Sequence, residues 1–265
     1  MPIAVLNETE LCYETHGDGD PLVLVPGFAS AAWSWEWQIG DLSDGFRVIA
    51  FDPRGVAGSK PKDGAQVSIT KIADDVAELL GELGIDAANV LGISFGGFVA
   101  QEFALRYPEK LKKLILASTS FGGPRHIAPA LEVLASFAST DGLNSSDRIR
   151  KYLTTAFSAE FVREHEAVVN RFCTLRELNV VPEDVYRQQL ASAMEFNADG
   201  RVGRITAETL VLTGDDDMVV PPANSRNLAE AIPGARLRTI KGGGHMAFVE
   251  RAGEFNAIVR EFFAE

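Results

Sequence analysis

Cysteine is scarce in this chain, with two residues in 265, and neither belongs to a pattern that binds metal. Cys12 and Cys173 lie far apart and match no metal-ligand or redox spacing. We therefore expect two free thiols, which are typical of a reducing compartment, and we predict a cytoplasmic protein. The sequence predicts no metal and no other cofactor.

Positive charge and long hydrophobic runs are also missing. The chain carries 25 Lys and Arg against 37 Asp and Glu, and its longest basic cluster is residues 110–113. Binding to a nucleic acid needs a basic face, so we expect no nucleic-acid partner. No apolar run is long enough to span a bilayer, and the first five residues contain no positively charged region. We therefore expect no membrane segment.

The chain is 46% apolar, which is enough to bury the core of one large domain. Short apolar runs alternate with segments of helical periodicity, an order typical of a parallel sheet covered on both faces. Buried strands are expected over residues 22–25, 46–51, 90–93, 114–117, 210–213 and 237–240, and helices over 69–83, 98–107 and 224–232. The predicted fold class is α/β, with a doubly wound, mostly parallel sheet. Its sites should lie beyond the carboxyl ends of the strands.

Residues 121–204 interrupt this alternation because they contain no clear buried strand. Their pattern indicates several amphipathic helices with phenylalanines spaced through them. We therefore expect a helical cap over 121–204, inserted into a core made of residues 1–120 and 205–265. The insertion begins where a strand ends, so it should hang over the site. The apolar faces of its helices could cover a pocket or a homodimer interface.

A candidate nucleophile lies at Ser94, between a strand-like run and a helix-like run, within the sequence Gly92-Ile93-Ser94-Phe95-Gly96. A serine at a sharp strand-to-helix turn has a strained backbone, and the chain packs closely around it. Glycines two residues to either side remove Cβ atoms that would clash. This pattern is typical of a nucleophile elbow and predicts that Ser94 is catalytic.

The candidate general base is His245. It follows the last expected strand and three glycines, which should let its loop approach the elbow closely, and it comes after the serine in the chain. Of the other histidines, His16 precedes a Gly/Asp turn, while His126 and His165 fall in the expected cap. We expect these three to lie at the surface or at helix ends.

A carboxylate must orient the imidazole, and the loop after the expected strand 210–213 offers Asp215, Asp216 and Asp217. Spacing alone does not choose among them. Three consecutive aspartates cannot all point inward, so two of them should be solvated or should cap the following helix.

An oxyanion needs two main-chain donors that face the serine from different sides. One should be the N–H of Phe95, directly after the nucleophile. The other should come from the loop after the first buried strand, Pro26-Gly27-Phe28, where Gly27 permits close approach and the N–H of Phe28 is the natural donor.

Together these motifs resemble the α/β-hydrolase family, in its serine esterase and enol-lactonase-like branch, over essentially the whole chain. Residues 52–59, DPRGVAGS, are similar to the family's D-x-R-G-x-G-x-S loop. The sequence Gly214-x-x-Asp217-x-x-Val220-Pro221 resembles its acid loop, and the resemblance implies that Asp217 is the acid. The terminal stretch from Gly244-His245 through an apolar helix also resembles the family.

Two motifs depart from the family pattern. The oxyanion loop of most relatives begins His-Gly, whereas this chain has Pro26-Gly27, which keeps the donor but lacks a bracing side chain. In the second loop, Val56-Ala57-Gly58 replaces a glycine-spaced pattern only in part, and this affects the loop conformation rather than the chemistry.

The resemblance implies hydrolysis of a carboxylic ester by a Ser94, His245 and Asp217 triad through an acyl-enzyme, without a cofactor. Serine at the elbow argues against dehalogenases and epoxide hydrolases, which use aspartate there. A 3-oxoadipate enol-lactonase-like lactone hydrolase is the leading alternative. A carbon–carbon hydrolase or perhydrolase is less favoured, because Met246 and Phe95 differ from their usual residues. A ligand receptor without turnover is the alternative of another class.

Aromatic residues near these positions favour a small to medium apolar acyl group. The candidate substrate-binding residues are Phe121, Met246 and Phe248. Arg125 and His126, at the start of the expected cap, could bind a substrate carboxylate, although solvated side chains are the simpler interpretation. The expected partner is a small-molecule ester or lactone.

Overall fold

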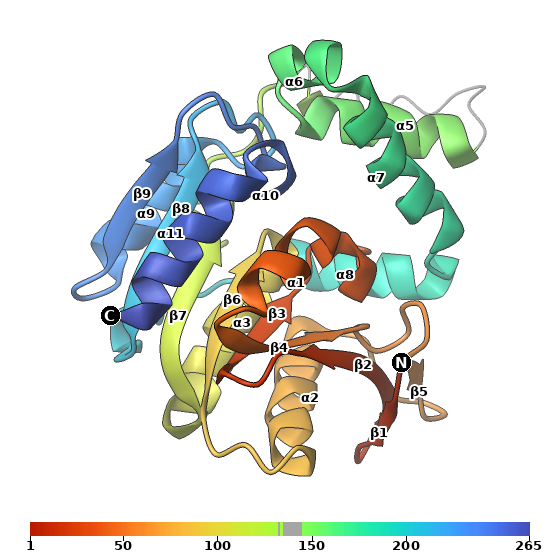
Figure 1. Ribbon diagram of the computed structural model, residues 1–265, viewed down its shortest axis with the longest axis vertical. Helices are drawn as coiled ribbons and strands as arrows, with labels where there is room; N and C mark the ends of the chain where they lie inside the picture. The colour runs from red at the N-terminus through yellow and green to blue at the C-terminus, as the bar shows by residue number, and fades with distance from the viewer. Residues whose placement is uncertain (132, 135–144) are drawn as a thin grey trace.

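The computed structural model describes residues 1–131, 133–134 and 145–265. A single twisted sheet forms the centre, with helices packed on both of its faces (Figure 1). This arrangement confirms the predicted α/β fold class with a mostly parallel sheet. The expected cap includes residues 132 and 135–144, which lie outside the described residues.

The strands follow the order β1-β2-β4-β3-β6-β7-β8-β9, and β5 pairs with β2. Their bounds are β1 Ile3–Val5, β2 Thr9–His16, β3 Asp20–Val25, β4 Phe46–Phe51, β5 Lys60–Pro61, β6 Ala88–Ile93, β7 Leu111–Ala117, β8 Glu208–Gly214 and β9 Arg236–Ile240. The pairs from β4 through β9 are parallel, whereas β1, β2 and β5 pair antiparallel at one edge. All six predicted strands are present.

The prediction that the last strand is buried was wrong. β9 forms the other edge of the sheet, and Leu237, Arg238 and Thr239 are exposed while Ile240 is buried. Residues 237–240 place the polar pair Arg238 and Thr239 between two apolar ends, and an edge strand has a neighbour on one side only, so this stretch is not buried on both faces.

Two buried clusters lie on opposite faces of the sheet, as side chains alternate along each strand. On one face, Val23, Val25 and their neighbours pack under α2 (Ile69–Glu82), α3 (Phe95–Arg106) and α9 (Pro222–Ala231). On the other, Leu22 and Leu24 pack under α1 (Glu36–Leu42) and α11 (Ala252–Ala264). The remaining short elements of the core are η1 Ala32–Trp35, η2 Pro108–Lys110, η3 Val202–Arg204 and α10 Ala247–Glu250.

The helix after the elbow starts three residues earlier than expected, at Phe95 instead of residue 98. Gly96 and Gly97 therefore belong to its first turn, although glycine is a poor helix former. A Cβ on Gly96 would overlap the carbonyl oxygen of Val25, and one on Gly97 would lie 2.6 Å from Thr119. Tertiary packing decides these two positions and overrides helix propensity.

Between β7 and β8 the described chain forms α5 (Ser145–Ala156), α6 (Ala159–Glu164), α7 (Glu166–Leu178) and α8 (Glu183–Glu195). In Figure 1, α5, α6 and α7 form a group at one end of the molecule, and α8 lies nearer the sheet. Side chains of α8 accept hydrogen bonds from core main-chain groups: Gln189 from Ala29, and Ser192 from Ile69. These bonds attach α8 to the loop after β3 and to the start of α2.

Candidate active site

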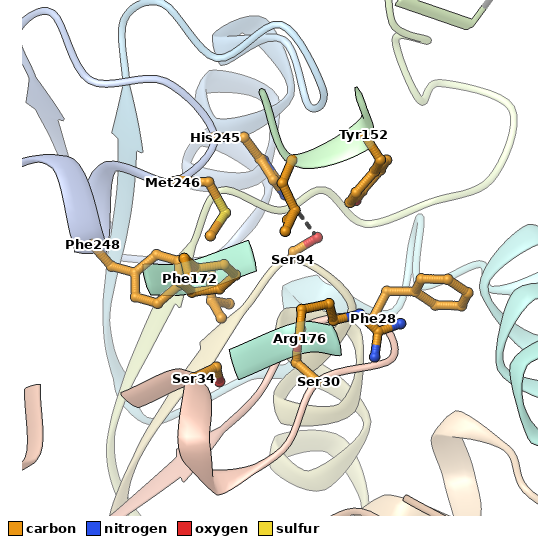
Figure 2. A pocket seen from close by; sticks show the side chains of 13 residues that line it. Phe28, Ser30, Ser34, Ser94, Tyr152, Phe172, Arg176, His245, Met246 and Phe248 are labelled. Carbon is orange, nitrogen blue, oxygen red and sulfur yellow. Dashed lines mark hydrogen bonds between the residues drawn. The ribbon is translucent and has the colours of Figure 1, made fainter. Parts of the chain in front are cut away.

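Ser94 lies at the turn between β6 and α3 with φ 54° and ψ −119°, a conformation that a residue with a side chain rarely adopts. The glycines around it are required by packing. A Cβ on Gly92 would overlap the carbonyl oxygen of Gly96, and a Cβ on Gly96 would overlap the carbonyl oxygen of Val25. The expected strained turn is therefore present, and the side chain of Ser94 projects into a pocket above the sheet (Figure 2).

His245 and Asp217 form a continuous chain of hydrogen bonds with Ser94. His245 Nε2 lies 3.1 Å from Ser94 Oγ, and His245 Nδ1 lies 2.9 and 3.1 Å from the two carboxylate oxygens of Asp217. A carboxylate only accepts, so Nδ1 carries the proton and Nε2 is left to accept from the serine hydroxyl. The three residues follow β6, β8 and β9, and thus meet at the carboxyl edge of the sheet.

The structure shows which of the three consecutive aspartates contacts His245, a choice that the sequence alone did not make. Asp217 is 2% exposed, and its carboxylate also accepts from the main-chain N–H groups of Val219 and Val220. Asp215 and Asp216 are exposed, and Asp215 instead accepts from the N–H of Gly242. Only Asp217 lies against His245, at the position that the resemblance implied.

The glycines before His245 have a different role from the expected one. A Cβ on Gly244 would lie 2.6 Å from the main-chain nitrogen of Ser158 and 2.7 Å from Glu250, and Gly243 packs against Ala247 and Gly214. The loop is therefore tight against β8 and the segment between α5 and α6, and not against the elbow. The main-chain N–H of Gly244 donates to the carboxylate of Glu250. This carboxylate is buried, and burial raises its pKa.

The two expected oxyanion donors, the N–H groups of Phe28 and Phe95, have no acceptor among the described residues. Phe28 follows β3, which pairs with β6, so the two loops are neighbours at the point where the sheet order reverses. Gly27 is less constrained than expected, because a Cβ there would make only ordinary contacts of 3.7 Å with Ile93 and Ser94.

The side chain of Asp52 stabilises the loop after β3 through a hydrogen bond. Its buried carboxylate accepts from the N–H of Ala32 at 3.2 Å and from the N–H of Gly58 at 2.9 Å. Burial raises the pKa of Asp52, and these two hydrogen bonds act in the opposite direction. In the loop after β4, which contains Asp52, Ala57 has φ 47°, so alanine occupies a left-handed position where the family pattern has glycine.

The pocket above Ser94 is open to solvent, and about 50 Å³ of it can hold the centre of a water-sized molecule. Phe172, Met246 and Phe248 form an apolar wall on one side (Figure 2), and Leu153 also lines the pocket. The polar side chains that line it are Ser30, Ser34, Tyr152, Arg176 and His245, in addition to Ser94. A concave, largely apolar lining with a few converging polar side chains is typical of small-molecule sites.

Of the candidate substrate-binding residues, Met246 and Phe248 line this pocket, but Phe121 does not. Phe121 is 1% exposed and packs in the core cluster under α3, because the chain turns inward after β7 and bridges to residues 197–198. Arg125 is likewise outside the pocket. It pairs with Asp199 and covers the outer side of Phe121.

The other histidines lie away from Ser94. His16 contacts Glu14, His126 contacts the hydroxyl of Ser120, and His165 packs against the ring of Phe161. His126 is half-buried, and burial lowers its pKa.

The sequence did not identify Tyr152, Phe172 and Arg176 as pocket residues. Phe172 had a signal, since it is one of the spaced cap phenylalanines, and it also packs against Trp33 and Trp37. Tyr152 had the same signal, as another of the aromatic residues spaced through the expected cap, whereas Arg176 had none. Their orientation depends on how α5 and α7 dock on the core, which periodicity does not determine.

Within the described ranges, no helix is long and apolar enough to cross a membrane. The same residues contain no cluster of three or more His, Cys, Asp or Glu side chains that could hold a metal ion. Cys12 and Cys173 are buried and are not joined to another cysteine.

Comparison with known proteins agrees with this geometry. The family model for the α/β hydrolase fold matches residues 20–252. A protein of Variovorax paradoxus (strain S110), provisionally named carbamate hydrolase RutD, is 30% identical over 257 residues, which cover 96% of each chain. Among solved structures, the enol-lactonase from Burkholderia xenovorans LB400 has a TM-score of 0.85 at 25% identity and covers 100% of both chains. A thermophilic esterase from Thermogutta terrifontis has a TM-score of 0.83 at 27% identity, with 98% and 95% coverage. The chain belongs to the α/β-hydrolase family, and it is an enzyme of the hydrolase class.

Proposed function

We propose that the protein hydrolyses carboxylic esters of small to medium apolar acids through an acyl-enzyme on Ser94. The observation that carries this proposal is the unbroken series of hydrogen bonds from Ser94 through His245 to Asp217, with separations of 3.1 and 2.9 Å. Each residue has a partner that suits one role: nucleophile, general base and orienting carboxylate.

In the first half of the reaction, His245 Nε2 accepts the proton of Ser94 as Oγ attacks the ester carbonyl carbon. The proton then passes from Nε2 to the departing alcohol oxygen as the carbon–oxygen bond breaks, which leaves the acyl group on Ser94. Asp217 stabilises the imidazolium that exists between these two transfers and keeps Nδ1 protonated.

The negative charge on the carbonyl oxygen needs donors that are already in place. The N–H groups of Phe28 and Phe95 suit this role because no other described group accepts from them. An oxyanion donor of this kind typically contributes about 10²- to 10³-fold to kcat.

In the second half of the reaction, water loses a proton to His245 and attacks the acyl carbon, and the acid leaves with Ser94 restored.

The acyl group would lie along Phe172, Met246 and Phe248, the apolar wall of the cavity. We further propose that residues 121–204 act as a cap that limits acyl length, since Leu153 and Phe172 reach the cavity from α5 and α7.

Lactone hydrolysis is the second candidate. The same groups would open a cyclic ester by the same steps, and the leaving alcohol would stay attached to the acyl group. The similarity in shape to the Burkholderia enol-lactonase, over the full length of both chains, favours this candidate.

The test is a panel of aryl esters from acetyl to dodecanoyl, together with an enol-lactone and an aryl carbamate, assayed with wild type and Ser94→Ala. The proposal expects rapid turnover of the shorter esters and a loss of at least about 10³-fold in Ser94→Ala, with the fold unchanged by circular dichroism. Fast lactone or carbamate turnover with negligible ester turnover would reassign the substrate class. Tight ligand binding with no turnover of any substrate would instead indicate a receptor.

A further inference from the structure

Arg176 is a half-buried arginine that lines the cavity above Ser94. It extends from α7 into the cavity that contains Ser94, and Figure 2 shows its guanidinium directed toward Phe28. Its only hydrogen bond among the described residues runs from Nη1 to the main-chain oxygen of Asn179, at 3.2 Å. No described carboxylate forms an ion pair with it.

Six other arginines of this chain have guanidinium groups with a structural role. Each has an acidic partner within ion-pair distance: Arg54 with Asp75, Arg106 with Asp74, Arg125 with Asp199, Arg171 with Glu36, Arg201 with Glu102, and Arg260 with Asp41. Arg47 is also half-buried without an acidic partner among the described residues, but of the two only Arg176 lines the cavity.

The surroundings of Arg176 do not balance its charge. Of the described residues that line the cavity, none is Asp or Glu. Burial lowers the pKa of the Arg176 guanidinium, and nearby Tyr152 and Tyr186 act in the opposite direction. A guanidinium stays charged in proteins, so the cavity holds a fixed positive charge that lacks an anionic partner.

We propose that Arg176 binds a free carboxylate of the substrate, so that the enzyme acts on esters or lactones that carry a second, ionised acid group. A planar guanidinium matches a carboxylate through two parallel hydrogen bonds, which fix the orientation of the substrate as well as its position. Ser30 lines the same cavity and offers a hydroxyl group to the same anion. This inference rests on the proposed function, because it assigns the substrate of the Ser94 site.

Arg176 therefore replaces Arg125 as the carboxylate-binding residue. Both are arginines of the segment between β7 and β8, but Arg125 is paired with Asp199 and lies outside the cavity. Arg176 can reach a substrate bound at Ser94 and Arg125 cannot, and the sequence alone does not reveal this difference.

The test compares two matched pairs of compounds that differ in one charge. Monomethyl glutarate and its monoamide place the group on the acyl side, and 4-acetoxybenzoate and 4-acetoxybenzamide place it on the leaving-group side. Binding to Ser94→Ala is measured by titration calorimetry, and hydrolysis is measured with wild type. We expect the carboxylate of at least one pair to bind about 10- to 100-fold more tightly than its amide, as hydrogen bonds to charged groups imply.

Arg176→Gln should reduce that ratio to about one, and Arg176→Lys should keep part of it. Arg171→Gln is the matched control, because Arg171 lies on the same helix, pairs with Glu36 and does not line the cavity. It should leave the ratio unchanged. A circular dichroism spectrum and thermal unfolding check that each variant is folded.

Equal binding of carboxylate and amide in both pairs, no binding of either carboxylate, or a ratio that survives Arg176→Gln would overturn the inference. These outcomes leave the proposed function standing if turnover still requires Ser94. Conversely, hydrolysis that persists in Ser94→Ala would overturn the proposed function, whatever the ratio shows.

Discussion

The main-chain N–H of Gly244, directly before His245, donates to both carboxylate oxygens of Glu250, at 3.1 and 3.2 Å. The same carboxylate accepts from the N–H of Ser158, between α5 and α6. Glu250 is thus a positioning residue, which joins the histidine loop to the helices over the site without contacting Ser94 itself.

Glu250→Ala should therefore lower kcat more than it raises KM, with a loss of roughly tenfold or more in kcat/KM. The N–H groups of Gly244 and Ser158 would lose a buried acceptor, which costs about 1–3 kcal/mol of unfolding free energy. Steady-state kinetics and urea unfolding measure both effects, and Glu250→Gln should recover part of each. Glu254→Gln, at an exposed position of α11, is the control. If Glu250→Ala matched that control in kcat, the positioning role would be refuted.

Asp217→Asn should reduce kcat by about 10³- to 10⁴-fold, because an amide next to Nδ1 no longer favours the tautomer that leaves Nε2 free to accept. Asp216→Asn is a close control, since Asp216 is the adjacent aspartate and is exposed. We expect it to keep wild-type kinetics. Comparable losses in the two variants would mean that the acid has been assigned to the wrong aspartate.

Two glycine substitutions should separate required from tolerated positions at the site. Gly96→Ala places a Cβ on the carbonyl oxygen of Val25, so we expect a severe loss of stability, more than about 3 kcal/mol, or no folded protein. Gly27→Ala makes only 3.7 Å contacts, and it should fold with a change below about 1 kcal/mol. Thermal and urea unfolding of both variants provides the comparison, and similar stabilities would contradict it.

The buried pair of Arg54 and Asp75 supports the loop that contains Asp52. Its two hydrogen bonds are 2.6 and 2.7 Å long, and the side chains are 2% and 1% exposed. Asp75→Leu leaves Arg54 buried without its main partner, and we expect a loss of about 3–5 kcal/mol in unfolding free energy. Replacing both residues, as Arg54→Met with Asp75→Leu, should cost less than the single change. A double variant that is less stable than Asp75→Leu would contradict this.

The sequence predicts the elbow well because its determinants are local. Ser94 needs glycines at 92 and 96 for steric reasons, and those requirements are visible in five consecutive letters. The six parallel strands were predicted for a similar reason, as continuous apolar runs are rare outside buried sheets. The edge position of β9 was not predicted, because it depends on the order of strands in space.

Residues of the pocket wall were harder to predict. Phe121 comes soon after the end of β7, at the same edge of the sheet as Ser94, yet the chain turns it into the core. Arg176 lies in the last turn of α7, where the sequence does not show which side of the helix faces Ser94. In both cases the answer depends on how the segment between β7 and β8 docks on the sheet, which involves contacts distant in sequence.

The central claim is that Ser94 becomes acylated during turnover. The most direct measurement is mass spectrometry of the enzyme, quenched in acid within milliseconds of mixing with 4-nitrophenyl butyrate, followed by peptide mapping. Our account predicts one butyryl group on the peptide that contains Ser94, formed with a burst of nitrophenol and absent from Ser94→Ala. Turnover that proceeds without modification of that peptide, or an acyl group mapped to another residue, would contradict it.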